Sequence, residues 1–284
     1  MTIAPSTMRI LSSLLEARTG QCLSEGRHWR VEMALNPILK KRGIEDCNAL
    51  AASLAAPDAR RLSDETVEAL LNNETYFFRD HDAFADLPRV FEAIAANRKG
   101  RKTLRIWSAG CSTGQEIYSV AMQLRDDERR WRDWSIELLG TDISQSVIDR
   151  AKRADFSQFE IQRGLAAGHM LRWFENSDGR WQARDTLRDM VHFRRHNVLD
   201  VPPPGQFDVI LCRNVMLYFP GINRAKALAN LARALAPDGA LMLGAGETVL
   251  GYSDRFEILP GVRSLYRLAA AEPPQILRVA AAGS

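Results

Sequence analysis

The sequence predicts an α/β protein in which a small all-helical domain precedes a doubly wound parallel sheet. Residues 1–85 show helical periodicity and no convincing strand, whereas strand and helix patterns alternate from residue 103 onward. Alternation of this kind is typical of a parallel sheet with crossover helices. A polar stretch at 158–189, which contains Trp173 and Trp181, interrupts the alternation, and we interpret it as an excursion from the sheet.

The helical half contains two clear patterns. Apolar residues from Val31 to Leu39 recur at helical spacing, although Pro37 lies inside the pattern and indicates either a kink or a displaced boundary. A later helix is expected to begin at Ser63, because serine is a favourable N-cap and an apolar face that includes Val67 follows it.

The sheet half contains short apolar runs that alternate with helical patterns. The expected strands are 104–107, 136–139, 190–193, 207–212, 240–243 and 264–268, and the expected helices are 117–124, 147–151 and about 222–235. We therefore expect a helical domain at 1–85, a sheet domain at 86–270 with an insert at about 158–189, and a flexible tail at 271–284.

The composition is that of an ordinary globular protein. With 284 residues, of which 46% are hydrophobic and 26% are charged, the chain can bury a sizeable core. No apolar run approaches the roughly 20 residues of a membrane span, and no charged leader precedes an apolar block at the start. We expect a cytoplasmic protein without membrane insertion.

Charge and cysteine spacing exclude several kinds of site. A net charge of +3 is too small to indicate nucleic acid, and basic and aromatic residues do not interleave as a base-stacking surface requires. The four cysteines, Cys22, Cys47, Cys111 and Cys212, form no C-x-x-C pair, which argues against a disulfide framework and against a zinc site. We expect no metal, and we interpret the cysteines as small buried hydrophobes.

A glycine loop follows the first expected strand. Its residues Gly110-Cys111-Ser112-Thr113-Gly114 satisfy the G-x-S-x-G pattern of a hydrolase nucleophile elbow, and they suit a cofactor loop equally well. An elbow hydrolase needs a histidine on a late loop, but the histidines after Ser112 are His169, His192 and His196. Because His192 and His196 lie on or beside an expected strand, a structural role is the better interpretation of both.

The next strand favours the cofactor interpretation. It ends in Gly140-Thr141-Asp142, and in doubly wound folds an acid at this place accepts hydrogen bonds from ribose hydroxyls. The loop is not G-x-G-x-x-G, and Glu116 at the helix start would repel a phosphate. An adenosine ligand that has no phosphate and carries positive charge, such as S-adenosylmethionine, suits the loop best. The simpler alternative is that Asp142 only begins a helix that Ser144 caps.

Five motifs in order resemble one family, the chemotaxis receptor glutamate O-methyltransferases of the CheR type. They are NETYFFR at 73–79, WSAGCSTGQEIYS from Trp107, GTDIS from Gly140, HNVLD from His196 and FDVILCRNVMLYF from Phe207. The simpler account of the first motif is a helix end with a buried aromatic pair. The resemblance implies a class I S-adenosylmethionine-dependent methyltransferase sheet of seven strands, an N-terminal helical domain and an inserted antiparallel subdomain at 158–189.

The resemblance also implies roles for individual residues. Asn73, Thr75 and Arg79 would close over S-adenosylmethionine, while Glu116 and Asp142 would hold its amino acid portion and its ribose. Asn197 and Val198 would flank the adenine, and Arg213 and Asn214 would lie near the methyl donor. Arg79 and Tyr218 are the catalytic candidates: Arg79 would hold the substrate carboxylate, and Tyr218 would line the methyl channel. A structural ion pair for Arg79 and a core position for Tyr218 are the alternatives.

Substrate chemistry and partners complete the hypothesis. A glutamate side chain, with a pKa near 4.3, is already ionised near neutral pH and needs no general base, and the products would be a glutamate methyl ester and S-adenosylhomocysteine. Two alternatives remain open: a methyltransferase acting on another acceptor, and a module that binds the cofactor and only docks to signalling partners.

The expected partner is the helical bundle of a methyl-accepting receptor. The helical domain has an excess of basic residues, which include Arg27, Arg30, Lys40, Lys41 and Arg42, although an ordinary solvated face would also account for them. The turn Asn176-Ser177-Asp178-Gly179 looks too short for the loop with which some family members hold a receptor tail peptide. We expect a monomer without this tether.

Overall fold

The computed structural model describes residues 3–23, 28–98, 100, 102–262 and 264–269. The expected tail at 271–284 and the basic residue Arg27 lie outside these residues. The chain divides into two compact units: Met1–Asn72 with Tyr218–Asn223, and Asn73–Leu217 with Arg224–Ser284. We call them the helical unit and the sheet unit.

In its described residues the helical unit contains helices and no strand. Its helices are α1 (Pro5–Thr19), α2 (His28–Arg42), α3 (Cys47–Ser53) and α4 (Arg60–Leu70). Leu11, Leu35 and Leu50 from three of these helices share one buried core. Pro37 stays inside α2.

The expected start of α4 at Ser63 is wrong. The helix begins at Arg60 after an Ala59 N-cap that makes no side-chain capping bond. The backbone N–H of Ser63 already donates to the carbonyl of Ala59 at 2.8 Å, and its side chain is buried. Ser63 therefore belongs to the first turn, and packing rather than capping places it there.

The boundary between the units falls after Asn72, not near residue 85. Phe77 and Phe84 lie on the sheet side of that boundary, and both are buried in the core of the sheet unit. Because both rings are buried in the sheet unit, the stretch that contains them belongs to that unit, although its helical pattern resembles that of the preceding residues.

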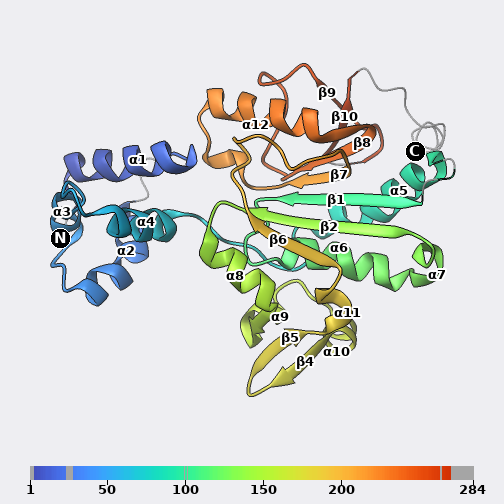
Figure 1. Ribbon diagram of the computed structural model, residues 1–284, viewed down its shortest axis with the longest axis horizontal. Helices are drawn as coiled ribbons and strands as arrows, with labels where there is room; N and C mark the ends of the chain where they lie inside the picture. The colour runs from blue at the N-terminus through green and yellow to red at the C-terminus, as the bar shows by residue number, and fades with distance from the viewer. Residues whose placement is uncertain (1–2, 24–27, 99, 101, 263, 270–284) are drawn as a thin grey trace. The chain divides into compact units, whose positions relative to one another are not determined.

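The main sheet has seven strands in the order β6-β2-β1-β7-β8-β10-β9 (Figure 1). Their bounds are β1 (Thr103–Ala109), β2 (Ser135–Asp142), β6 (Val191–Arg195), β7 (Phe207–Cys212), β8 (Leu235–Leu243), β9 (Phe256–Ile258) and β10 (Leu265–Leu268). Strands β6, β2, β1, β7 and β8 pair in parallel, and β10 is antiparallel to both β8 and β9. The predicted doubly wound α/β fold is confirmed.

Strand β1 shows why these residues form a central strand. Leu104, Ile106 and Trp107 have no exposed surface, although their side chains do not all point to the same face of the sheet. A strand that is buried on both faces is typical of a parallel sheet covered by helices.

Helices connect the strands of the main sheet. They are α5 (His81–Asn97), α6 (Gln115–Asp126), α7 (Glu128–Trp131), α8 (Gln145–Arg153), the 3₁₀ helix η1 (Met216–Tyr218) and α12 (Gly221–Ala234). Helix α6 packs against β1, β2 and β6, α8 packs against β2 and β6, and α5 packs against β8. None of the helices in the described residues is long and apolar enough to cross a membrane.

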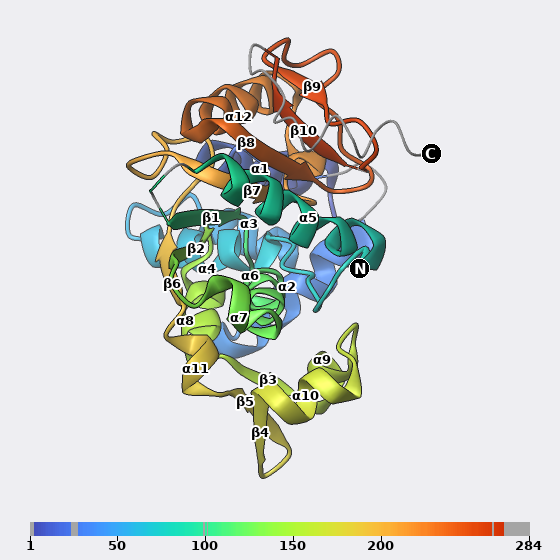
Figure 2. The same cartoon turned by 90° about the vertical axis from the view of Figure 1, so that its right-hand side faces the viewer.

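A second, three-stranded antiparallel sheet has the order β3-β5-β4. It lies apart from the main sheet, as Figure 2 shows. Its elements are β3 (Asp155–Ser157), α9 (Gln158–Gln162), α10 (Ala167–Trp173), β4 (Phe174–Ser177), β5 (Arg180–Ala183) and α11 (Asp185–Arg188). We call residues 155–189 the insert, and its antiparallel sheet confirms the expected subdomain.

Candidate active site

The carboxyl ends of four neighbouring parallel strands bring most of the predicted site residues to one edge of the main sheet. Along the chain, β2 and β6 are added on one side of β1, and β7 and β8 are then added on its other side. In open α/β sheets ligands bind at such a switch point, which lies here between β1 and β7. The residues that follow these strands are the glycine loop at 110–114 after β1, Asp142 at the end of β2, Asn197 and Val198 after β6, and Arg213 and Asn214 after β7.

The glycine loop is tied to β2. The backbone N–H groups of Gly110 and Cys111 both donate to the carbonyl of Thr141, at 2.7 and 2.9 Å. Gly110 has a φ of 84°, and a Cβ there would lie 2.3 Å from a methyl group of Val215. Only glycine allows this left-handed turn to approach the segment after β7 so closely.

Asp142 is buried at the end of β2, and its carboxylate holds the glycine loop. One oxygen accepts from the backbone N–H of Ser112 at 2.9 Å, and the other accepts from the N–H of Ser144 at 3.0 Å. Ser144 also caps α8, as the simpler interpretation expected. Capping and ligand binding are compatible, because each carboxylate oxygen can accept more than one hydrogen bond.

Glu116 and Arg213 form a buried ion pair behind this edge. One Glu116 oxygen accepts from the Ser108 hydroxyl at 2.8 Å, and the other accepts from the Arg213 guanidinium at 3.2 Å. The guanidinium also donates to the Asp80 carboxylate at 2.6 Å and to the Arg79 carbonyl at 2.7 Å. The Arg213 side chain is only 1% exposed, so removal of one partner would leave an uncompensated buried charge.

The NETYFFR segment, residues 73–79, lies beside the glycine loop. The Ser112 hydroxyl donates to the Asn73 carbonyl at 2.7 Å, and the N–H of Phe78 donates to the Ser119 hydroxyl at 3.0 Å. The Arg79 guanidinium donates to the carbonyl of Glu74 at 3.0 Å. The segment is therefore fixed to the start of α6.

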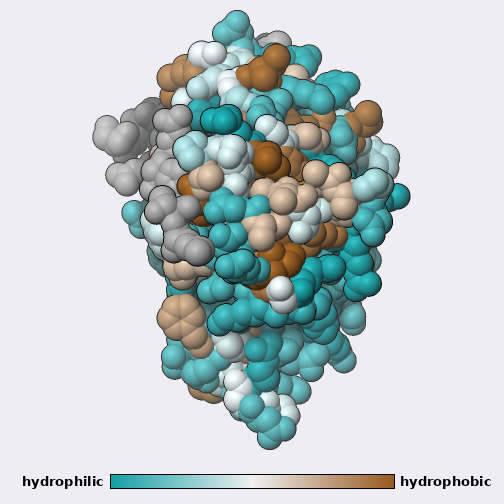
Figure 3. All heavy atoms as spheres, turned by 90° about the vertical axis from the view of Figure 1, so that its left-hand side faces the viewer, coloured by the Kyte–Doolittle hydropathy of each residue, from teal (hydrophilic) through white to brown (hydrophobic). Residues whose placement is uncertain are grey.

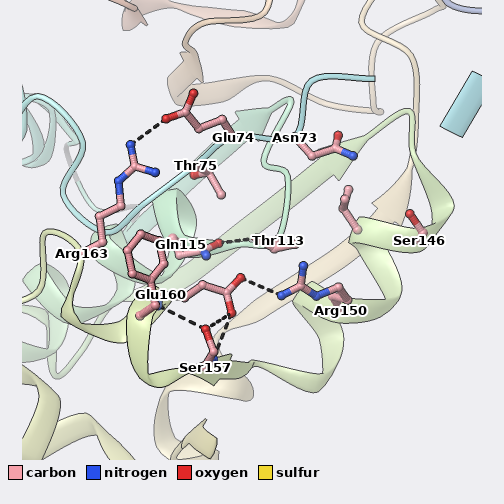
Figure 4. A pocket seen from close by; sticks show the side chains of 12 residues that line it. Asn73, Glu74, Thr75, Thr113, Gln115, Ser146, Arg150, Ser157, Glu160 and Arg163 are labelled. Atoms are coloured by element: carbon pink, nitrogen blue, oxygen red, sulfur yellow. Dashed lines mark hydrogen bonds and ion pairs between the residues drawn. The ribbon is translucent and has the colours of Figure 1, made fainter. Parts of the chain in front are cut away.

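A pocket of about 610 Å³ opens beside this segment. Figure 4 shows Asn73 and Thr75 on one side of it and Arg150 and Glu160 on the other, while Arg163 reaches to Glu74. Two ion pairs line it: Arg150 with Glu160 at 2.7 Å, and Arg163 with Glu74 at 2.6 Å. Of the predicted site residues, the pocket brings together Asn73 and Thr75, and the others do not line it.

Hydrogen bonds between side chains and backbone hold the loop after β6. The Asn197 side chain accepts from the N–H of Leu199 at 3.0 Å, and the carbonyl of the buried Val198 accepts from the Asn230 amide at 2.9 Å. The His196 ring contacts the carbonyl of Val201 at 2.9 Å, and the backbone N–H of His196 donates to the carbonyl of Asp142. These contacts agree with the structural role expected for His196.

The buried cysteines are not reactive thiols. Cys47, Cys111 and Cys212 are buried, and Cys22 is partly buried. Burial raises the pKa of the Cys111 and Cys212 thiols well above the ordinary value, so both stay protonated. The expectation that they serve as small hydrophobes agrees with this geometry.

Comparison with known proteins identifies the family. A family model described as the CheR methyltransferase SAM-binding domain matches residues 73–264. The chain belongs to the CheR methyltransferase family. It is 33% identical over 276 residues to the chemotaxis protein methyltransferase of Vibrio parahaemolyticus, covering 94% of this chain and 98% of that protein. It is 32% identical over 277 residues to chemotaxis protein methyltransferase 1 of Pseudomonas aeruginosa, covering 94% and 99%.

Solved structures show a weaker likeness. The glycopeptide N-methyltransferase MtfA, solved in complex with S-adenosylmethionine, matches with a TM-score of 0.35 and 14% identity, covering 66% of each chain. The family match is the stronger finding: this CheR-family protein is an S-adenosylmethionine-dependent methyltransferase.

The residues at the sheet edge fit S-adenosylmethionine. Asn214 Oδ1 is buried and has no hydrogen-bond partner in the described part of the chain, so it offers an acceptor to an amino group of a ligand. Asn214 also has a φ of 59°, which keeps the chain after β7 in a left-handed turn. A carboxylate at the place of Asp142 is typical of sites that accept hydrogen bonds from a ribose.

Glu247 lies at the same edge of the sheet, and sequence reasoning missed it. Its carboxylate accepts from the N–H groups of Asn214 at 2.6 Å, Met216 at 2.8 Å and Gly244 at 2.8 Å. Burial raises the pKa of Glu247, and the hydrogen bonds from these backbone groups oppose the rise. The signal available in the sequence was an acid just after β8, at the same edge of the sheet.

Tyr218 does not join the other candidates in the sheet unit. It ends η1, and its hydroxyl accepts a hydrogen bond from the Asn72 amide. Its carbonyl accepts from the N–H of Cys22 at 2.8 Å. Both partners belong to the helical unit, as do Tyr218 and the five residues that follow it.

Proposed function

We propose that this enzyme transfers a methyl group from S-adenosylmethionine to glutamate side chains of chemotaxis-type receptors. The products are glutamate methyl esters and S-adenosylhomocysteine. The observation that carries this proposal is the match to CheR-family methyltransferases over nearly the whole chain, whose relatives are named for chemotaxis. The edge of four parallel strands supports it, because it offers a carboxylate and buried acceptors for the cofactor.

Bound S-adenosylmethionine would supply an electrophilic methyl group on a sulfonium sulfur. The chain would hold the cofactor by its ribose at Asp142, by its amino acid portion near Glu116, Arg213 and Asn214, and by its adenine between Asn197 and Val198. Asn73 and Thr75 would cover it.

Transfer to a glutamate carboxylate needs no general base, because the side chain is ionised well above a pKa of about 4.3. What the protein supplies is an in-line approach in a site that excludes water, and such orientation contributes roughly 7–11 kcal/mol. Arg79 is the residue proposed to hold the substrate carboxylate, as a charge-assisted pair. Tyr218 is proposed to line the approach of the methyl acceptor.

The partner is proposed to be the helical bundle of a methyl-accepting receptor, which the helical unit of a monomeric enzyme binds in the cytoplasm. Lys40, Lys41 and Arg42 end α2 and are exposed. Trp29 and Met33 are exposed one helical turn apart on α2. Figure 3 shows one face of the molecule on which apolar side chains gather among hydrophilic ones.

A receptor tail tether is proposed to be absent. The β4–β5 hairpin pairs Ser177 with Arg180, so only Asp178 and Gly179 form its loop. Both have positive φ, 52° and 77°, as a tight two-residue hairpin requires. A loop of this length leaves little chain for holding a peptide.

Labelling tests the reaction. Purified enzyme is incubated with tritiated S-adenosylmethionine and receptor-bearing membranes. Base-labile label on the receptor is the expected result, because an ester hydrolyses in alkali. Base-stable label would indicate a methyltransferase acting on another acceptor, and cofactor binding without transfer would indicate a docking module.

A further inference from the structure

The core of the insert is completed by a residue from outside it. The ring of Phe77 lies 5.1 Å from that of Phe156 on β3 and 5.5 Å from that of Phe174 on β4, and all three pairs among these rings meet edge to face. Phe77 has no exposed surface. Edge-to-face packing of this kind stabilises beyond the area it buries.

The insert also approaches the backbone of the NETYFFR segment. Gly164, which follows α9, has a φ of +84°, and a Cβ there would lie 2.0 Å from the carbonyl oxygen of Phe77. No heavy atom fits at that distance, and the obstacle is backbone rather than a flexible side chain. Glycine is therefore required at this position both for its turn and for the close approach.

Arg163, the neighbour of Gly164, makes a third contact with the segment. Its guanidinium lies 4.3 Å from the ring centroid of Tyr76 and donates to the Glu74 carboxylate at 2.6 Å (Figure 4). This ion pair is exposed, so its own contribution is small. It adds to the contacts that Gly164 and the phenylalanine rings make with the same segment.

The opposite side of the segment contacts the glycine loop and α6. Ser112 donates to the Asn73 carbonyl, and Phe78 donates to Ser119. The segment thus lies between the insert and the cofactor loop. Asn73 and Thr75 line the same pocket as Ser157 and Arg163 of the insert.

We propose that the insert positions the cofactor-covering segment. Through the Gly164–Phe77 approach and the three phenylalanine rings, it fixes where Asn73 and Thr75 lie. A disturbance inside the insert therefore weakens cofactor binding even though the insert supplies none of the proposed cofactor ligands. This inference rests on the cofactor roles proposed for Asn73 and Thr75.

Two glycine variants in the insert test it. Gly164→Ala forces a Cβ against the Phe77 carbonyl, whereas Gly179→Ala imposes the same kind of backbone strain, at a φ of +77°, with no atom within 4 Å. The Kd for S-adenosylhomocysteine is measured by calorimetry on the full chain, with circular dichroism as the check on folding. We expect affinity to fall tenfold or more for Gly164→Ala and less than twofold for Gly179→Ala.

Equal affinity of folded Gly164→Ala and wild-type protein would overturn the proposal, and so would an equal loss in both variants. If Gly164→Ala does not fold, Phe174→Leu decides the question, because it keeps most of the core volume and removes a ring that touches Phe77. We expect it to weaken binding about threefold or more, and unchanged affinity would again overturn the proposal. The labelling experiment with wild-type protein is separate. If no label reaches the receptor, the proposed substrate is contradicted, but the Kd values of the variants still decide whether the insert positions the segment.

Discussion

The hydroxyl of Ser112 donates a 2.7 Å hydrogen bond to the backbone carbonyl of Asn73. The serine of the G-x-S-x-G sequence thus joins the glycine loop to the segment that is proposed to cover the cofactor. Its backbone N–H is used as well, because it donates to the Asp142 carboxylate at 2.9 Å. Ser112 holds two parts of the site together, which is a different task from that of a nucleophile.

Ser112→Ala is expected to leave methyl transfer nearly intact. The variant loses one hydrogen bond to a carbonyl, a net loss of about 0.5–1.5 kcal/mol, or roughly 2- to 12-fold in the cofactor Kd at most. Steady-state rates with receptor membranes, compared with those of the wild type, check this. A loss of several orders of magnitude would restore the nucleophile hypothesis.

Asp142→Ala is expected to weaken cofactor binding strongly. Two ribose hydroxyls would lose a charged acceptor, and each such bond contributes on the order of 1.5–3 kcal/mol, so the Kd should rise by about a hundredfold or more. Calorimetry with S-adenosylhomocysteine measures it. Asp149→Ala on α8 is the control, because Asp149 is exposed and its carboxylate accepts a hydrogen bond from the exposed Gln145. An unchanged Kd for Asp142→Ala would contradict the ribose assignment.

Arg79→Ala is expected to lower methyl transfer more than cofactor affinity. Among the described residues its guanidinium makes one hydrogen bond, to the Glu74 carbonyl, and it lies 5.5 Å from the ring centroid of Tyr76. Most of its donors can therefore serve a carboxylate. Single-turnover rates at saturating cofactor, paired with the cofactor Kd, separate the two effects. Equal losses in both quantities would reassign Arg79 to cofactor binding alone. Arg79→Lys keeps the charge and should recover part of the rate.

Reversing the charges of Lys40 and Lys41 is expected to slow receptor methylation. Attraction between this end of α2 and receptor glutamates would speed encounter at low salt and fade with ionic strength. Arg42 is left unchanged, since it pairs with Glu65 at 3.0 Å, whereas Lys41 makes only a longer pair with that carboxylate, at 3.9 Å. The control reverses Arg9 and Arg60, which are exposed elsewhere on the helical unit and change the net charge equally. The same rate in both double variants would contradict a role for α2 in docking.

Glu137 is expected to make the protein lose stability in acid. Its hydrogen bonds to Arg105, at 2.6 and 3.0 Å, lower the pKa of Glu137 below its ordinary value of 4.5. Because the folded-state pKa is lowered, this stabilisation is present above pH 4.5 and is lost as the pH falls through the folded-state pKa. Urea unfolding between about pH 3 and 6 should show a shallower acid loss for Glu137→Gln than for the wild type. If the free energy of unfolding falls equally with pH in both proteins, the Glu137–Arg105 pair does not contribute to the acid sensitivity.

Much of the sheet unit could be predicted because its signals are local. The strand at 207–212 was predicted with the bounds that the structure has, since all six of its residues are buried and all but Asp208 are apolar. The glycine loop and Asp142 were found because each follows a strand whose carboxyl end lies at the ligand edge. Strands β3 and β9 were missed, because three residues are too short for any period to be visible.

The remaining features depend on contacts between distant parts of the chain. Ser63 carries a good capping signal, but packing places the helix start three residues earlier, at Arg60. Glu247 and Gly164 look like ordinary loop residues in the sequence. Glu247 matters because the chain brings it to the N–H of Asn214, and Gly164 matters because it meets the carbonyl of Phe77. No local sequence pattern indicates either of these two contacts.

The position of Phe77 in the core of the insert has a consequence for biosynthesis. Its ring partners, Phe156 on β3 and Phe174 on β4, leave the ribosome up to about a hundred residues later, on the order of 5–20 s at typical elongation rates. During that interval the nascent chain displays three aromatic residues in a row, Tyr76, Phe77 and Phe78, without the rings that later bury Phe77. We therefore expect the NETYFFR segment to expose apolar surface in the nascent chain until the insert is synthesised, as chaperone-binding segments do.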